Sequence, residues 1–294
     1  MGKIADALSL RGLDPLRAVT SNLVSPQTLL GLRGFLLLFE FVLLVSSIVH
    51  QTLIDQKGWM FLAFFTNLTF LGELAYFAVA TYHSYRFTRC PQYASPTLRS
   101  DSLWTRAHYL LYSTVTVFHL IVPVVYWSVL YKPKKEDTPF SLYVNVGKHG
   151  MDFVLVAFEF IFGRMLIVWG TMPWVIGCLI FYMFWAWVVH AINDTWVYHF
   201  LNWHKPAGVV TGWYLGLAIG MSLVFILSLY AHRLRDRLFS RVAERVEDQE
   251  RLQREMRYRM SSVTLEMHEQ KLGAPLGATS IAPVDVADTK PTSF

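Results

Sequence analysis

The chain has 294 residues, of which 54% are hydrophobic and only 16% are charged. Soluble domains carry about 25% charged residues, so this composition excludes an ordinary soluble globular protein. The net charge of +5 is modest. It belongs mostly to loops and the C-terminal segment, which argues against a nucleic-acid partner.

Residues 1–27 are interrupted by polar side chains and contain Lys3, Arg11 and Arg17. A cleaved signal peptide has a basic start, an apolar core and a cleavage site of small residues, and this segment lacks that order. We therefore predict a cytoplasmic N-terminal segment, with the first membrane span acting as the insertion signal.

Long apolar runs follow, each near the length of about 20 residues that a helix needs to cross the hydrocarbon layer. Backbone groups in lipid must be satisfied within the segment, so helices are the default. The sequence therefore predicts an all-α polytopic bundle of roughly six transmembrane helices. The predicted spans are about 28–49, 60–83, 104–130, 144–166, 173–193 and 208–231.

The fourth span is the weakest of these, because it carries His149, Asp152, Glu159 and Arg164. Charged groups are costly in hydrocarbon, so a re-entrant segment is the alternative at this position. If this segment is re-entrant, the fifth and sixth spans would cross the membrane in the opposite direction.

The distribution of Lys and Arg among the short loops predicts the orientation, because basic residues favour the cytoplasmic side. The side that holds both termini carries more of them, so we expect both termini to be cytoplasmic. The main contrary feature is a cluster of three lysines after the third span, Lys132, Lys134 and Lys135.

Residues 232–270 are rich in Arg, Glu, Gln and Met and contain no proline, which predicts a polar cytoplasmic helix. An imperfect apolar stripe would let this helix lie on the membrane face or pair with a protein partner, and a solvated helix is the further alternative. Residues 271–294 are small and contain proline, which predicts a disordered tail. The stripe consists of Val242, Val246, Leu252, Met256, Val263 and Met267.

Polar residues inside the spans carry the functional hypotheses, because a charged residue at the helix centre costs about 2.5–3.5 kcal/mol. These residues are Glu40, Thr66, Asn67, Thr69, Glu73, His119, His149, Asp152, Glu159 and His190.

Two of these residues share a depth in the membrane. The second span should begin on the non-cytoplasmic side, which places Thr66 about 9 Å deep at about 1.5 Å per residue. The fourth span begins on the same side, which places His149 about 7.5 Å deep. Asp152 shares the helix face of His149, and His190 and Asp194 lie at the outer end of the fifth span. We expect these groups to line one pocket that opens towards the outer leaflet.

A threonine hydroxyl becomes a nucleophile when a base takes its proton, and histidine is the usual base because its pKa lies near neutrality. We therefore predict Thr66 as nucleophile and His149 as base. Asp152 or Asp194 would orient the imidazole, and the Asn67 amide would donate to a developing oxyanion. The substrate would be a lipid ester that arrives sideways from the bilayer. The alternative is that Thr66 and His149 are helix-packing residues, since threonine in a span often bonds to its own helix.

Metal and cofactor motifs are weak or absent in the sequence. His199 and His204 stand close together, but their spacing is neither three nor four residues. The sequence contains no HExxH motif, no pair of histidines separated by three residues, no Gly-rich phosphate loop and no Gly-x-Ser-x-Gly elbow. The sequence therefore predicts no metal site and no cofactor.

Three short stretches stand out by their order and spacing: 59–70, 148–159 and 196–206. The first contains the Thr66-Asn dipeptide, the second opens with Lys-His, and the third is an aromatic loop before the last span. Together they resemble the androgen-induced, androgen-dependent and rolling-stone-like membrane protein families. The resemblance covers roughly residues 30–230.

The androgen-induced members are intramembrane threonine hydrolases that cleave fatty acid esters of hydroxy fatty acids. The resemblance therefore implies Thr66 as the nucleophile and His149 as its partner, whereas the rolling-stone branch is linked to cell fusion. The chain departs from the hydrolase pattern at Asn67, where the hydrolases have an apolar residue, and at Tyr198-His199, where they have Tyr-Pro. Both departures favour the rolling-stone branch.

The leading hypothesis is a lipid-ester hydrolase in the endoplasmic reticulum, another endomembrane or the plasma membrane, with membrane lipids and a lipid substrate as its partners. The runner-up is a non-catalytic scaffold or receptor-like protein, whose protein partner binds the helix of 232–270. A transporter is third, because the inner halves of the spans have few polar residues beyond Glu159 and Arg164.

Overall fold

The computed structural model describes residue 10 and residues 13–89, 102–132 and 138–271, with side chains up to residue 239. The regular secondary structure of these residues consists of helices and contains no β-strand, so the predicted all-α class is confirmed. The chain divides into two units, 1–244 and 245–294. The described part of the second unit is helical as far as residue 271. The structure does not describe the side chains of the predicted apolar stripe. The predicted tail lies outside the described residues from 272 onward.

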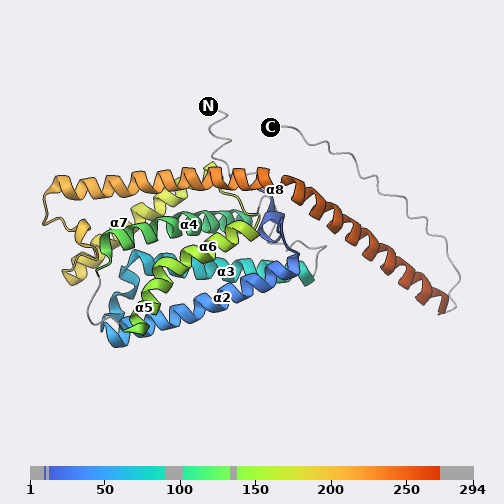
Figure 1. Ribbon diagram of the computed structural model, residues 1–294, viewed down its shortest axis with the longest axis horizontal. Helices are drawn as coiled ribbons and strands as arrows, with labels where there is room; N and C mark the ends of the chain where they lie inside the picture. The colour runs from blue at the N-terminus through green and yellow to red at the C-terminus, as the bar shows by residue number, and fades with distance from the viewer. Residues whose placement is uncertain (1–9, 11–12, 90–101, 133–137, 272–294) are drawn as a thin grey trace, which may run out of the picture. The chain divides into compact units, whose positions relative to one another are not determined.

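The helices of the first unit run back and forth beside one another (Figure 1). Short π-helical and 3₁₀ turns extend or join them. The main helices are α2 (Pro26–Val49), α3 (Phe65–Arg89), α4 (Leu103–Val125), α5 (Pro139–Val146), α6 (Asp152–Phe162), α7 (Met172–Asn193) and α8 (Ala207–Lys271). The π turns are η2 (His50–Ile54), η4 (Tyr126–Leu130) and η5 (Gly147–Met151). The 3₁₀ turns are η1 (Pro15–Ala18), η3 (Gly58–Ala63), η6 (Trp169–Thr171) and η7 (His199–Leu201).

Local sequence signals set several helix starts. Ser25, Ser102 and Thr138 cap α2, α4 and α5, because each side chain accepts a hydrogen bond from the backbone N–H three residues later. Pro26 and Pro139 then occupy the first helical turn, where a missing N–H costs nothing. These signals place the three helix starts close to the beginnings of apolar runs.

Four helical segments are long and apolar enough to cross a membrane. Their outer faces expose large apolar side chains, such as Phe181 on α7 and Leu227 on α8, each 69% exposed. Apolar surface of this extent requires lipid rather than water, so the chain is an integral membrane protein. The segments are Pro26–Ile54, Leu103–Leu130, Trp169–Asn193 and Ala207–Phe239.

The second and fourth predicted spans correspond to α3 and to α5–α6, which are more polar than the other four. α3 packs against α2 and α4, and α6 packs against the same two helices. The fourth predicted span is not one regular helix, because the π turn η5 separates α5 from α6. It also ends at Phe162 rather than at 166, since Gly163 adopts an extended conformation and terminates α6.

Gly147, the first residue of η5, lies against α2. A Cβ atom at Gly147 would collide with the side chain of Leu43, so the close approach of these two elements requires glycine. Lys148 and His149 are the next two residues of the same π turn. Single π turns inside helices occur frequently at functional sites.

Polar contacts also occur in the half of the bundle away from η5. The sequence predicted few polar residues in this half beyond Glu159 and Arg164. Arg33 donates two hydrogen bonds to the Glu159 carboxylate, at 3.0 and 2.5 Å, and one to Ser84 Oγ at 2.7 Å. Tyr112 and His232 form a further buried hydrogen bond of 2.7 Å between α4 and α8. This half of the bundle therefore contains more polar groups than the sequence predicted.

Candidate functional site

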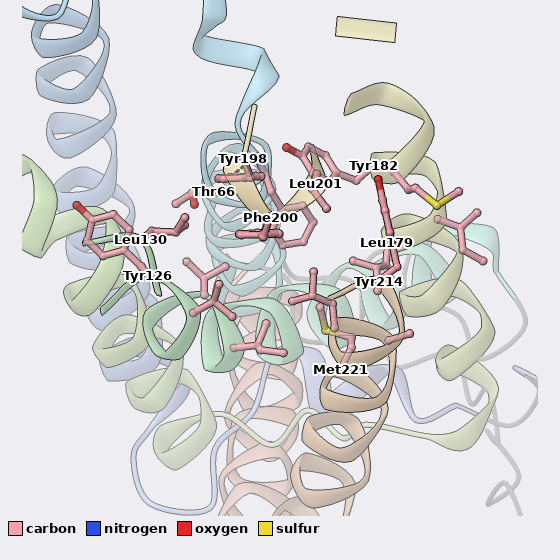
Figure 2. Close-up of a pocket in the computed structure, with 18 of the residues that line it drawn as sticks. Thr66, Tyr126, Leu130, Leu179, Tyr182, Tyr198, Phe200, Leu201, Tyr214 and Met221 are labelled. Atoms are coloured by element: carbon pink, nitrogen blue, oxygen red, sulfur yellow. Dashed lines mark hydrogen bonds between the residues drawn. The ribbon is translucent and has the colours of Figure 1, made fainter. Parts of the chain in front are cut away.

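An apolar cavity of about 210 Å³ lies between the start of α3 and helices α4, α7 and α8 (Figure 2). Two of its lining residues, Ile180 on α7 and Leu215 on α8, are themselves exposed at 48% and 59%. The cavity therefore reaches the apolar outer surface of the protein. Its lining is almost entirely hydrocarbon and aromatic, which is suited to an acyl chain.

Thr66 is the second residue of α3, and its side chain lies in the cavity wall beside Tyr198 (Figure 2). The Tyr198 hydroxyl accepts a hydrogen bond from the backbone N–H of Phe65 at 3.1 Å. It also interacts with both the hydroxyl and the backbone N–H of Thr66. The first N–H groups of a helix have no partner within that helix. At the start of α3, the phenol oxygen therefore takes the place of those missing partners.

Tyr198 belongs to the loop between α7 and α8 and was not among the predicted site residues. Burial raises the pKa of Tyr198 above its ordinary value, while the hydrogen bonds from Thr66 and Phe65 oppose the rise. The phenol thus keeps its proton at neutral pH and is available as a donor. The histidines of this loop were its apparent functional residues in the sequence, but its tyrosine is the residue that contacts Thr66.

His149 approaches the same cavity through Tyr126. The two rings stack with centroids 3.4 Å apart and planes at 8°, and Tyr126 lines the cavity. η5 packs against both α3 and α4. His149 is buried, and among the described residues its Nδ1 has no hydrogen-bond partner. No hydrogen bond joins His149 to Thr66 within the described part of the chain.

Asn67 links the two elements that carry the predicted pair. Its amide nitrogen donates to Gln51 Oε1 at 2.9 Å and to the Phe61 carbonyl at 2.8 Å. Its amide oxygen accepts from Lys148 Nζ at 3.1 Å, which connects α3 to the residue before His149. Because both amide N–H groups are occupied, the oxyanion role predicted for Asn67 would require breaking these bonds.

The other predicted supporting residues lie apart from Thr66 and His149. Asp152 is fully buried and faces His119, with 3.9 Å between Oδ2 and Nε2. His190 stacks on Trp196 with ring centroids 3.9 Å apart. Asp194 is an exposed residue with φ of 50° that terminates α7. Within the described residues, no hydrogen bond or ion pair connects these three to His149, so neither carboxylate orients its ring in this structure.

Helix α8 forms one wall of the cavity and is hydrogen-bonded near both ends of its membrane segment. Near its start, the Tyr214 hydroxyl accepts from Trp187 Nε1 at 2.9 Å. Near the other end, Arg235 donates to the carbonyl oxygens of Phe160 and Met165, each at 2.8 Å. The face of α8 between these anchors borders the cavity.

Comparisons with known proteins give no match to a family model, a curated protein or a solved structure.

Proposed function

We propose that this protein is an intramembrane hydrolase of fatty-acyl lipid esters, such as fatty acid esters of hydroxy fatty acids. Thr66 is its nucleophile and His149 its base. One observation carries the proposal: Thr66 lies in the wall of an apolar cavity that reaches the lipid-facing surface. The resemblance of the surrounding residues to the androgen-induced family favours the same pair.

In this mechanism the oxygen of Thr66 attacks the ester carbonyl carbon while its proton passes to His149. The alcohol leaves with that proton, and water then releases the fatty acid from the acyl-threonine. The N–H groups of Phe65 and Thr66 now bond the Tyr198 hydroxyl. Once the substrate displaces that hydroxyl, they would stabilise the oxyanion, as N–H groups at a helix start do for other anions. They replace Asn67 in that role because Phe65 and Thr66 line the cavity, whereas Asn67 is not in the lining.

The proposed mechanism requires His149 to move closer to Thr66. Catalytic hydrogen bonds are often long or absent before substrate binds, and here the ring of Tyr126 covers one face of the histidine. An acyl chain in the cavity would displace this ring, because Tyr126 is part of the lining. Substrate binding would thereby bring base and nucleophile together.

We further propose six membrane spans, formed by α2, α3, α4, α5–α6, α7 and the first part of α8, with both termini and the C-terminal helix in the cytoplasm. Two polar contacts support placing α3 and α6 inside the bundle. Lys148 bonds Asn67, and Glu159 is paired with Arg33. Polar helices of this kind are stable in a membrane when their polar groups face other helices. The endoplasmic reticulum, other endomembranes and the plasma membrane all fit this arrangement.

The alternative function is a non-catalytic membrane scaffold or receptor-like protein whose partner binds the C-terminal helix. The contacts of Thr66 with Tyr198 and of His149 with Tyr126 favour it, because both are also ordinary packing contacts. Under this alternative, the cavity is a defect in packing that lipid fills.

A lipid-like fluorophosphonate probe applied to membranes distinguishes the two functions. Under the hydrolase proposal, wild-type protein is labelled, and labelling disappears in Thr66→Ala and His149→Ala at equal expression. The matched controls are Thr81→Ala, on the same helix but away from the cavity lining, and His204→Ala, an exposed histidine. Both controls should keep full labelling. Folded wild-type protein that remains unlabelled would contradict the hydrolase proposal and favour the scaffold alternative.

A further inference from the structure

A second group of chemically active side chains lies inside the bundle, outside the cavity. Glu73 of α3, His119 of α4 and Asp152 of α6 are each 0% exposed. His119 Nε2 lies 3.2 Å from Glu73 Oε2 and 3.9 Å from Asp152 Oδ2. One potential ligand atom of each residue lies within 4.8 Å of the other two. Three separate helices therefore bring one imidazole and two carboxylates to a single point.

These carboxylates are poorly compensated by their surroundings. Among the described residues, no hydrogen bond reaches either carboxylate oxygen of Glu73 or Oδ2 of Asp152. Glu40 of α2 is a third buried carboxylate without a hydrogen bond there, and it is close enough to interact electrostatically with both. Burying ionised carboxylates without partners is costly, so protons or a cation must offset this negative charge.

The hydrogen bond between His119 and the backbone of Val115 shows which ring nitrogen carries the proton. The other nitrogen then presents its lone pair to the carboxylates. Nδ1 lies 2.9 Å from the carbonyl oxygen of Val115, and because a carbonyl only accepts, Nδ1 carries the proton. Neutral His119 thus turns the lone pair of Nε2 towards Glu73 at 3.2 Å, which places two acceptors face to face. A cation bound by both His119 Nε2 and the Glu73 carboxylate would remove the repulsion between these two acceptors. Metal-bound histidines usually donate their other N–H in this way.

We propose that Glu73, His119 and Asp152 bind a divalent transition-metal ion, with Zn²⁺ as the leading candidate. Zn²⁺ binds imidazole nitrogen and carboxylate oxygen at about 2.0–2.2 Å, so tetrahedral ligand atoms lie roughly 3.3–3.6 Å apart. The two distances from His119 Nε2 to the carboxylate oxygens, 3.2 and 3.9 Å, are within a few tenths of an ångström of this range, and all three ligand atoms lie within 4.8 Å of one another. The ion offsets the charge of two carboxylates, with which Glu40 also interacts electrostatically.

The metal would cross-link α3, α4 and α6 in the interior of the bundle. Its binding does not depend on the proposed hydrolase activity, because Thr66 and His149 are not among the ligands. Asp152 follows His149 by less than one helical turn, so the ion would also fix the start of α6 next to η5.

Metal content measured by inductively coupled plasma mass spectrometry tests the proposal. The full chain is produced in cells supplied with zinc, manganese and iron, and purified in detergent through a tag that contains no histidine. We expect about one metal ion per chain in the wild type, and at least a tenfold loss in Glu73→Gln, His119→Gln and Asp152→Asn. His108→Gln removes another buried histidine of α4, outside the cluster, and should keep the wild-type content.

Measurements on the wild-type protein test the metal site even if a variant fails to fold. Protein purified from metal-depleted cells should unfold at a lower temperature than the zinc-loaded protein, and adding Zn²⁺ alone should restore the difference. Monodisperse wild type with less than a tenth of an ion per chain, or with the same content as monodisperse His119→Gln, would overturn the site. The cluster would then be held by protons alone.

Discussion

The guanidinium of Arg33 and the carboxylate of Glu159 meet inside the bundle with side chains 0% and 2% exposed. Two parallel hydrogen bonds join them, and Ser84 satisfies a further donor of the guanidinium. Such a pair gains enough from its geometry to offset the desolvation of both charges. Each residue is therefore tolerated in its apolar setting only because the other is present.

Replacing one partner of this pair should destabilise the protein strongly. We expect Arg33→Ala or Glu159→Ala to lower the free energy of unfolding by about 3–5 kcal/mol, because the remaining charge stays buried without compensation. The double variant Arg33→Met, Glu159→Leu should lose less than either single variant. Thermal unfolding in detergent measures this, with Arg86→Ala, an exposed cation of α3, as the control. A comparable loss in the control would contradict the explanation.

Tyr198 offers a second residue-scale test, which rests on the proposed hydrolase. Tyr198→Phe removes the hydroxyl beside Thr66 but keeps the ring in the cavity wall. We expect kcat for a long-chain ester to fall about tenfold, equivalent to about 1.4 kcal/mol, with little change in KM. Tyr214→Phe is the matched control, since it also lines the cavity but pairs with Trp187 instead. Equal losses in both variants would indicate general disruption rather than positioning of Thr66.

Helix α8 contributes a small residue to the wall of the cavity. Ala218 lies on the face that borders the cavity, and the next residue, Ile219, faces outward with 60% of its side chain exposed. A small residue at the first position leaves space that a larger side chain would occupy. A large apolar side chain at position 218 would therefore reduce the volume of the cavity, whereas the same side chain at position 219 would leave the volume unchanged.

If the proposed hydrolase function holds, filling the cavity should alter which esters the protein accepts. We expect Ala218→Phe to reduce hydrolysis of long-chain esters at least tenfold while short-chain esters are still cleaved, because only a long acyl chain needs the filled space. Ile219→Phe places the same ring on the outer face and should leave both activities near wild type. A loss of both activities in Ala218→Phe with unchanged folding would assign the cavity a role other than acyl binding.

At the scale of the whole molecule, the number of spans decides which loops share a side. With six spans, Thr88 lies on the side of the N-terminal segment and Lys132 lies on the opposite side. If only the four most apolar segments crossed, these two residues would exchange sides. Asp14 and Thr195 keep their sides under both topologies.

Cysteine labelling in intact cells that display the protein at the plasma membrane distinguishes these topologies. After Cys90 and Cys178 are changed to serine, we expect Lys132→Cys and Thr195→Cys to react with a membrane-impermeant maleimide. Asp14→Cys and Thr88→Cys should react only after permeabilisation. Early labelling of Thr88→Cys, together with protection of Lys132→Cys, would support four spans and contradict six.

The sequence was sufficient for the helices but not for the contacts between them. Apolar runs and capping residues are local signals, so the all-α class and the approximate positions of the main helices could be predicted. The ligands Glu73, His119 and Asp152 come from three different helices, so no spacing along the chain reveals them. The π turn of η5 and the stacking of Tyr126 on His149 likewise depend on packing, as does the contact of Tyr198 with Thr66.

The membrane segment of α8 is hydrogen-bonded near both ends, while the face between these anchors borders the cavity. Under the proposed function, a lipid enters the cavity from this side by leaving the acyl chains that surround the exposed Ile180 and Leu215. The work of leaving them depends on the lateral pressure and chain order of the surrounding bilayer. Turnover of the same protein should therefore be slower in an ordered membrane than in a fluid one at equal substrate density, so the physical state of the host membrane itself sets a limit on the rate.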